Sequence, residues 1–221
     1  MALDTARRAD ELGYTSFWTA ETTGPDAFST LAVVGAAQPR LGLGTGVLAL
    51  QLRTPMLAAM SAATLQMFGP ERDVFLGVGI SSPVVVGRWH GAGYGDRPLD
   101  QVREYLTLVR ECLSGEPVTF DGDFWSCRKF RLGLRLGERR PRLVVGALNE
   151  RMLKLAGEHL ASELPELLSF AQRRQLNLAD MVTRTVPLEA MAINDAEATR
   201  PSASWSRIPA AGPSSMPRIA A

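Results

Sequence analysis

The chain has 221 residues, of which 46% are hydrophobic and 21% are charged, and its 24 basic and 23 acidic residues leave a net charge of +1. This near balance argues against a nucleic-acid-binding surface. No apolar run approaches the length of a membrane span, and the N-terminus lacks the pattern of a signal peptide, so we expect a cytoplasmic protein without a membrane partner.

Helix and strand patterns alternate along the first 160 residues. Helices are predicted where polar caps, proline in a first turn and apolar residues at helical spacing occur together. The predicted helices span residues 2–12, 25–37, 54–65, 99–113 and 150–160, and the predicted buried strands lie near residues 16–20, 41–47, 74–78 and 143–145. Because a helix lies between each pair of strands, and such crossovers are right-handed, we expect one parallel sheet in sequential order.

Two of these strands break into glycines and hydroxyl residues at their C-terminal ends. One reads Leu41-Gly42-Leu43-Gly44-Thr45-Gly46-Val47, and the other reads Leu76-Gly77-Val78-Gly79-Ile80-Ser81-Ser82. Backbone without side chains lets a flat ring or a phosphate come close, and parallel α/β folds carry their chemistry at this end of the strands. The glycines could equally permit close packing of helices on the sheet. In either case the parallel arrangement predicts that residues 46–47, 79–82 and 146–149 share one edge.

Two segments depart from the simple alternation. A loop that contains Trp89-His90-Gly91 is predicted after Ser82, and residues 115–130 predict a small hairpin around Thr119-Phe120-Asp121-Gly122 outside the main sheet. Four β/α units in about 160 residues favour part of a (β/α)8 barrel over a three-layer sandwich. The predicted fold class is therefore α/β, a partial TIM barrel.

Several segments together resemble the bacterial luciferase-like family, and in particular its branch of oxidoreductases that depend on coenzyme F-420, a deazaflavin. They are Ala9-Asp10-Glu11-Leu12-Gly13-Tyr14, the two glycine-rich strands with Pro83, Trp89-His90-Gly91, Gly115-Glu116-Pro117-Val118 and Val145-Gly146-Ala147-Leu148. The resemblance covers residues 1–161. It implies a TIM barrel, commonly a homodimer, that binds a flavin or deazaflavin at its C-terminal mouth and moves a hydride to or from C5 of that ring.

The resemblance also implies the cofactor and the kind of substrate. It implies coenzyme F-420, with FMN as the alternative, and a small-molecule substrate. Relatives that oxidise sugar phosphates have a histidine and a glutamate where this chain has Thr22 and Ile80, so that substrate class is not expected. Nothing in the sequence predicts a metal site.

Compared with the family pattern, the chain is expected to lack the first barrel strand and the C-terminal half. The pattern stops near Ala161, and residues 164–198 resemble the C-terminal tail of zinc-type alcohol dehydrogenases. Residues 199–221, rich in Pro, Ser and Ala, are predicted to be disordered. We therefore expect a partial barrel over residues 1–161, an unrelated segment over residues 162–198 and a disordered tail.

Two side chains are candidates for catalysis. Glu21 ends its strand as a carboxylate that could serve as an acid or base, or could simply face water in a loop. His90 follows Trp89 and could bind a substrate or phosphate, or could only fasten its own loop.

The candidate cofactor-binding residues follow the strand ends: Thr45, Gly46, Val47, Gly79, Ser81, Ser82, Gly146 and Ala147. The resemblance implies a cis peptide bond between Gly46 and Val47 that forms a bulge behind the deazaflavin ring. Ser81 and Ser82 could donate hydrogen bonds to the coenzyme or only cap the turn.

Three hypotheses about function remain open at this point. The first is a flavin- or deazaflavin-dependent oxidoreductase, impaired by truncation. The second is a non-catalytic coenzyme-binding remnant, and the third is a chimeric product without a function of its own.

Overall fold

The structure is a computed structural model, and it describes residues 1–160 of the chain. The predictions made above for residues 162–198 and 199–221 lie outside the described residues. Within residues 1–160, no helix is both long enough and apolar enough to cross a membrane.

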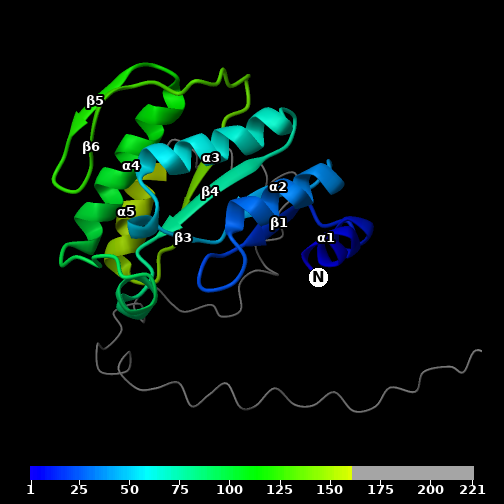
Figure 1. Ribbon diagram of the computed structural model, residues 1–221, viewed down its shortest axis with the longest axis horizontal. Helices are drawn as coiled ribbons and strands as arrows, with labels where there is room; N and C mark the ends of the chain where they lie inside the picture. The colour runs from blue at the N-terminus through cyan, green and yellow to red at the C-terminus, as the bar shows by residue number, and fades with distance from the viewer. Residues whose placement is uncertain (161–221) are drawn as a thin grey trace, which may run out of the picture. The chain divides into compact units, whose positions relative to one another are not determined.

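Helices and strands alternate along the described chain (Figure 1). The helices are α1 (Ala2–Glu11), α2 (Ala27–Ala37), α3 (Pro55–Phe68), α4 (Pro98–Ser114) and α5 (Glu150–Leu160), with a 3-10 turn η1 (Leu50–Leu52) and a π-helix η2 (Val84–Trp89). The strands are β1 (Ser16–Thr19), β2 (Gly42–Thr45), β3 (Leu48–Ala49), β4 (Val74–Gly79), β5 (Val118–Asp121), β6 (Ser126–Phe130) and β7 (Arg142–Val145).

The main sheet is parallel, and its strands lie in the order β1, β2, β4, β7. The short strand β3 also pairs with β4, at Val78, where the other edge of β4 is already occupied by Val145 of β7. Because a strand has only two edges, β3 continues β2 along the same edge of β4. The predicted parallel sheet in sequential order is therefore confirmed, and it follows from the helical crossover between successive strands.

A β-bulge separates β2 from β3. Gly44 pairs with Phe75 and Leu48 pairs with Val78, so four steps along one strand match three steps along its neighbour. The extra residue lies in the segment that contains Gly46 and Val47, and a bulge of this kind bends the strand and redirects its side chains. The peptide bond between Gly46 and Val47 is cis, as the resemblance implies.

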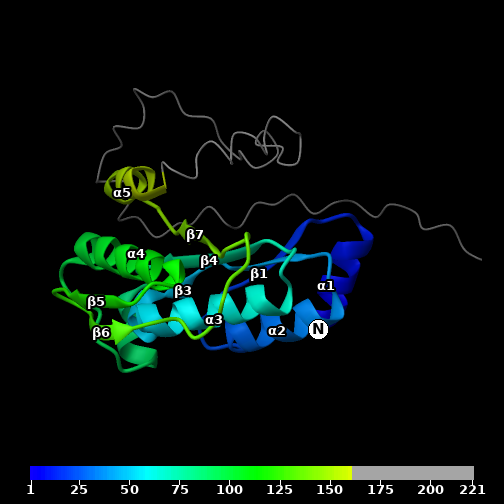
Figure 2. The same cartoon turned by 90° about the horizontal axis from the view of Figure 1, so that it is seen from above.

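The two faces of the sheet carry different residues because side chains alternate along each strand. Leu43, Leu76 and Leu143 belong to the face that packs against the helices, and each is at most 5% exposed. Figure 2 shows α2 and α3 side by side along this face. The register places Trp18, Gly44, Phe75 and Arg142 in one row across the opposite face.

Local sequence signals explain where the helices begin and end. The Thr54 hydroxyl accepts a hydrogen bond from Leu57 N (3.3 Å) and Pro55 occupies the first turn, as predicted for α3. Helix α4 ends at Gly115, whose φ of +84° suits glycine. The loop predicted after Ser82 is wrong in part, since Ser82 Oγ accepts from Val85 N (3.3 Å) and starts the π-helix η2.

The predicted hairpin outside the main sheet is confirmed as the antiparallel pair β5 and β6, and α4 holds its turn. The carboxylate of Glu104 accepts hydrogen bonds from three consecutive backbone N–H groups, those of Asp123 (2.8 Å), Phe124 (2.9 Å) and Trp125 (2.7 Å). The Tyr105 ring meets Trp125 edge-on at 5.2 Å between centroids. One helix turn thus anchors both the backbone and an aromatic side chain of the hairpin.

We predict that Glu104→Ala lowers the free energy of unfolding by about 2–4 kcal/mol, because three N–H groups lose a charged acceptor at once. Urea denaturation of the full chain measures this change. Glu111→Ala, at an exposed position of the same helix, is the matched control and should stay within about 0.5 kcal/mol of the parent. Equal losses in both variants would contradict the anchoring role of Glu104.

Candidate functional site at the C-terminal edge of the sheet

The segments predicted to share one edge of the sheet do so. Gly146 N donates a hydrogen bond to Val78 O (2.9 Å), so the backbone that follows β7 lies beside the end of β4. The bulge meets both, because a Cβ built on Gly79 would lie 2.8 Å from Val47 Cγ2 and one built on Gly146 would lie 3.4 Å from the same atom. The C-terminal ends of β3, β4 and β7 therefore form one continuous edge.

The isopropyl group of Val47 occupies the space that side chains on neighbouring strands would need. It lies over Gly77, Gly79 and Gly146, at 2.8–3.4 Å from the position that each Cβ would take. At Gly79 this contact, and at Gly77 an approach of 2.0 Å to Thr45 O, leave no room for a Cβ, so these two glycines are required for the bulge to lie close to the sheet. Of the two readings of these glycines, close packing is thus established, but the partner is the bulge and not a helix.

The hydroxyl of Thr45 is used inside the sheet. It donates to Gly77 O (2.8 Å) and accepts from Gly77 N (2.8 Å), and the residue is 1% exposed. The side chain of Thr45 therefore replaces the ladder hydrogen bonds that the bulge interrupts between β2 and β4. Among the candidate cofactor-binding residues it is the one whose hydroxyl is fully engaged by backbone.

Gly79 is buried beneath Val47, and the other candidates reach the surface of this edge. Gly46 and Ser81 are exposed, and Ser82, Gly146 and Ala147 are half-buried. Ser81 has a φ of +58°, and its carbonyl accepts a hydrogen bond from the Tyr94 hydroxyl (3.3 Å). The Ser81 hydroxyl and the backbone around the glycines are thus the groups that a ligand at this edge would meet.

Trp18 is a residue of the site that sequence reasoning missed. Its indole covers Gly44, where a Cβ would lie 2.4 Å from the ring, and it stacks on Phe75 with centroids 5.0 Å apart. It also reaches the bulge, since a Cβ on Gly46 would lie 3.4 Å from the indole. The pairing of an aromatic residue in one strand with a glycine in the next is a signal that could have revealed this contact.

Glu21 belongs to an ion-pair network. Arg53, just after η1, donates from Nη2 to Glu21 Oε1 (2.8 Å) and from Nε to Glu21 Oε2 (3.4 Å), and it also binds Asp26. The hydrogen bond with Glu21 raises the pKa of Arg53, so the guanidinium stays charged. Burial favours the neutral form of Asp26, but hydrogen bonds from Ser29 and the charge of Arg53 outweigh it and lower the pKa of that carboxyl.

His90 is engaged as well. Its Nε2 lies 2.7 Å from the backbone carbonyl of Thr22, in the loop that joins β1 to α2. A carbonyl oxygen only accepts, so Nε2 carries the hydrogen, and in the neutral ring Nδ1 is then left with a lone pair. Glu21 and Thr22 belong to the same loop, so the contact of Arg53 with Glu21 and that of His90 with Thr22 both hold this loop in place.

This arrangement offers a flat ring a surface of backbone and apolar side chains. Within the described residues, no three metal-binding side chains cluster. The bulge leaves Gly46 exposed and Val47 half-buried, so backbone and apolar surface face outward there. Two surface hollows lie elsewhere, one near Leu113 and Arg140 and the other near Gly42 and Asp73 at the N-terminal edge, so neither belongs to this site.

A parallel sheet in sequential strand order, joined by helical crossovers, is the arrangement of a sector of a (β/α)8 barrel. The chain belongs to the luciferase-like monooxygenase family, whose model matches residues 1–175. The family match thus runs past Ala161, where the sequence patterns indicate its end. The similarity of residues 164–198 to alcohol dehydrogenases lies beyond the described residues and has no further support.

Individual relatives share this region of the chain. A Mycobacterium tuberculosis protein, provisionally named a coenzyme F420-dependent oxidoreductase, is 41% identical over 115 residues, which are 52% of this chain and 33% of that protein. A 5,10-methylenetetrahydromethanopterin reductase of Methanolobus tindarius is 30% identical over 155 residues, which are 69% of this chain and 46% of that protein. The chain therefore spans less than half the length of these relatives.

A solved structure shows the same fold. An F420-dependent secondary alcohol dehydrogenase, in complex with an F420–acetone adduct, superposes with a TM-score of 0.65 at 24% identity. The match covers 71% of this chain and 51% of that chain. At this identity the likeness concerns the fold alone, and it confirms the predicted α/β fold as part of a luciferase-like barrel.

We predict that Gly79→Ala destabilises the protein by about 1–3 kcal/mol, because the added methyl group meets Val47 Cγ2 at 2.8 Å. Val47→Ala removes that obstacle, so the double variant should be more stable than the sum of the two single changes implies. Thermal or urea unfolding of the four proteins measures the coupling. Gly137→Ala, with no atom within 4 Å of the new Cβ, is the control. Strict additivity would show that Val47 does not fill the space over Gly79.

Proposed function

We propose that this chain provides the coenzyme-binding edge of an oxidoreductase that uses coenzyme F420. The observation that carries the proposal is the bulge at Gly46 and Val47, which lies against the glycines of β4 and β7 at the C-terminal edge. A relative and a solved structure named for F420 support this choice of coenzyme. FMN is the alternative, since a flavin has a tricyclic ring of the same shape.

The chain's own groups would bind and orient the ring. The backbone at Gly46 and Val47 would lie behind the ring, and Ser81, Ser82, Gly146 and Ala147 would contact the rim of the ring or its side chain. Gly79, buried beneath Val47, would act only by leaving room for the bulge. The coenzyme itself would supply hydride transfer to or from a small-molecule substrate. His90 and Glu21 would hold the loop after β1 in place, His90 through its hydrogen bond to Thr22 O and Glu21 through its ion pair with Arg53.

The described chain supplies only part of such a site. A complete TIM barrel has eight strands, whereas the sheet described here has four strand positions. Strands β2 and β3 together fill one position, and β1, β4 and β7 fill one each. Each missing hydrogen bond to a charged group lowers the binding free energy of the coenzyme by about 1.5–3 kcal/mol. We therefore propose that the chain by itself binds the coenzyme weakly, and that a non-catalytic remnant or a chimeric product without function are the competing interpretations. The cytoplasmic location stays a prediction.

We predict that the 221-residue chain causes no quenching of F420 fluorescence at micromolar protein. A version extended by the first strand and the last β/α units of the Mycobacterium tuberculosis relative should bind, at least about a hundredfold more tightly, because two lost charged hydrogen bonds account for that factor. Parallel titrations with FMN identify the preferred coenzyme. Failure of the extended version to bind either compound would refute the proposed function, and tight binding by the chain alone would refute the proposed weakening.

We also propose that the protein forms a homodimer through α2 and α3. Neither helix contains an Asp, Glu, Lys or Arg, over 11 and 14 residues respectively, whereas five of the ten residues of α1 are charged. A helix on the outside of a soluble domain normally carries charge on its outer face. These two neighbouring helices instead expose apolar side chains: Val33, Leu57, Met60, Met67 and Phe68, each 44–73% exposed.

A second copy of the chain is the partner that this surface fits best. An uncharged patch meets its own copy without electrostatic repulsion, whereas a different protein partner would commonly be selected by complementary charges. Fully exposed, a large apolar side chain presents on the order of 200 Å², so five that are about half exposed present roughly 500 Å². The small residues between them add to this area, which approaches the ~800 Å² per partner of a standard interface.

We predict that the full chain has twice the mass of one chain in solution, and that Met60→Glu makes it monomeric by placing two carboxylates across the symmetry axis. Size-exclusion chromatography with light scattering measures the mass. Leu153→Glu, at an exposed leucine of α5, is the matched control and should stay dimeric. A monomeric parent protein, or dissociation by both substitutions alike, would contradict an interface on α2 and α3.

A further inference from the structure

We infer that Arg53 and His90 are positioning residues that fasten the β1–α2 loop, residues 20–26, to the segments that follow β3 and β4 at the C-terminal edge of the sheet. The inference rests on the proposed function insofar as the loop borders the coenzyme site. It concerns the apo protein as well, because every contact that carries it lies within the chain. It also gives His90 and Glu21 a role in positioning this loop, in place of the acid–base role that the sequence suggests.

Arg53 fastens the loop from the side of the bulge. Its guanidinium forms hydrogen bonds with both oxygens of Glu21 and a further one with Asp26, the N-cap of α2. Phe28 lies under the guanidinium, with 5.0 Å between Cζ and the ring centroid. The side chains of Arg53 and Glu21 are only 17% and 15% exposed, so solvent screens this pair less than a surface ion pair.

The geometry of this contact requires arginine. A planar guanidinium can bind two oxygens of one carboxylate and a second carboxylate together, while it also stacks on an aromatic ring. A lysine ammonium is a point charge and would meet only part of this set. Glu21 Oε1 also accepts from Ala27 N (3.4 Å), so the same carboxylate links Arg53 to the first residue of α2.

His90 fastens the loop from the side of β4. The imidazole follows η2, and its Nε2–H donates to Thr22 O at 2.7 Å. Protonation of the ring adds a hydrogen at Nδ1 and leaves Nε2–H in place, so this bond persists in either charge state. The contact joins two segments that are 68 residues apart in the sequence.

The loop needs contacts of this kind because no sheet ladder holds it. Strand β1 ends at Thr19, whose carbonyl accepts from Gly46 N (2.9 Å), and α2 begins at Ala27. The intervening residues have no helix or strand structure. Arg53, from the segment after β3, and His90, from the segment after β4, both bind this stretch, and they thereby fix its position relative to the bulge.

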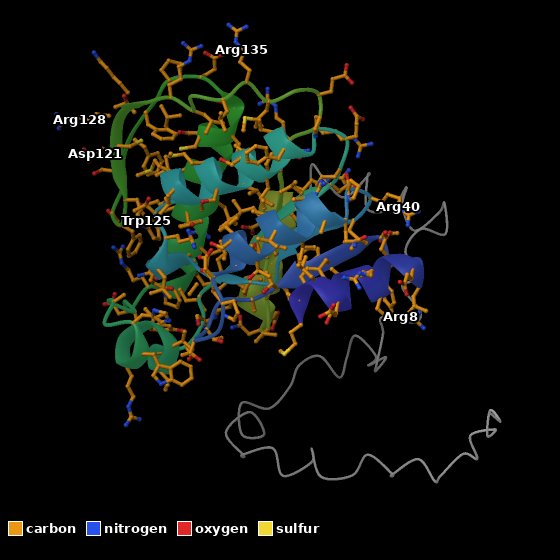
Figure 3. The ribbon with its side chains drawn as sticks, turned by 45° about the vertical axis from the view of Figure 1, so that its right-hand side comes forward. Arg8, Arg40, Asp121, Trp125, Arg128 and Arg135 are labelled. Carbon is orange, nitrogen blue, oxygen red and sulfur yellow. The ribbon has the colours of Figure 1, made fainter. Side chains whose placement is uncertain are left out.

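Hydrogen exchange of the full chain without coenzyme tests this inference. We expect Arg53→Gln and His90→Phe each to speed amide exchange in residues 20–27 about tenfold, because each removes a strong anchor of the loop. His90→Gln retains an N–H donor near the position of Nε2 and should restore most of the protection. Arg40→Gln removes the exposed ion pair with Asp10 and should leave the loop unchanged. Figure 3 shows Arg40 beside α1, near Arg8.

The extended chain described above separates a positioning role from a catalytic one. There, Arg53→Gln and His90→Phe should weaken F420 binding about tenfold and leave the hydride-transfer rate at saturating coenzyme unchanged. Unchanged exchange of residues 20–27 in both variants would overturn the inference, as would a lowered transfer rate with unchanged affinity. If the extended chain binds neither F420 nor FMN, the proposed function fails, and the exchange experiment still decides the role of the two residues. If His90→Phe does not fold, His90→Ala takes its place as the variant without the donor, and His90→Gln stays the variant expected to keep the protection.

Discussion

The C-terminal edge of the sheet depends on the contact between Val47 and the glycines of two neighbouring strands. The isopropyl group fills space over Gly77, Gly79 and Gly146, so it joins β3 to both β4 and β7. Thr45 completes the junction, because its hydroxyl donates a hydrogen bond to the C=O of Gly77 and accepts one from the N–H of the same residue. The bulge is thereby built into the sheet as a packed element, and the loops that follow the strands take their positions from it.

The loops at the C-terminal edge are tied to one another as well as to the sheet. The bulge segment leads through η1 to Arg53, which binds the loop after β1, and that loop also receives His90 from the segment after β4. Three crossovers that are distant in sequence thus meet through side chains at one place. A rearrangement of any one of these loops would therefore break its side-chain contacts with the others.

Much of the architecture could be predicted from sequence because it follows from local rules. The parallel order of the strands follows from helices between them, and the starts of α2 and α3 follow from Asp26 and Thr54. The glycines indicated close approach, but not that Val47 and Trp18 would supply the approaching atoms. The roles of Arg53 and His90 were hidden for the same reason, since both act on a loop at least 27 residues away. The π-helix after Ser82 was missed because three successive valines do not favour a helix.

The stacking of Trp18 over Gly44 has a consequence for how relatives of this protein can diverge. The indole occupies the volume that any side chain at position 44 would need, and it stacks on Phe75. Positions 18 and 44 are therefore coupled: a larger residue at position 44 is compatible only with a smaller one at position 18. Homologues with a larger side chain at position 44 should accordingly have a smaller one at position 18. Intermediates that keep both the indole and a new side chain would be selected against.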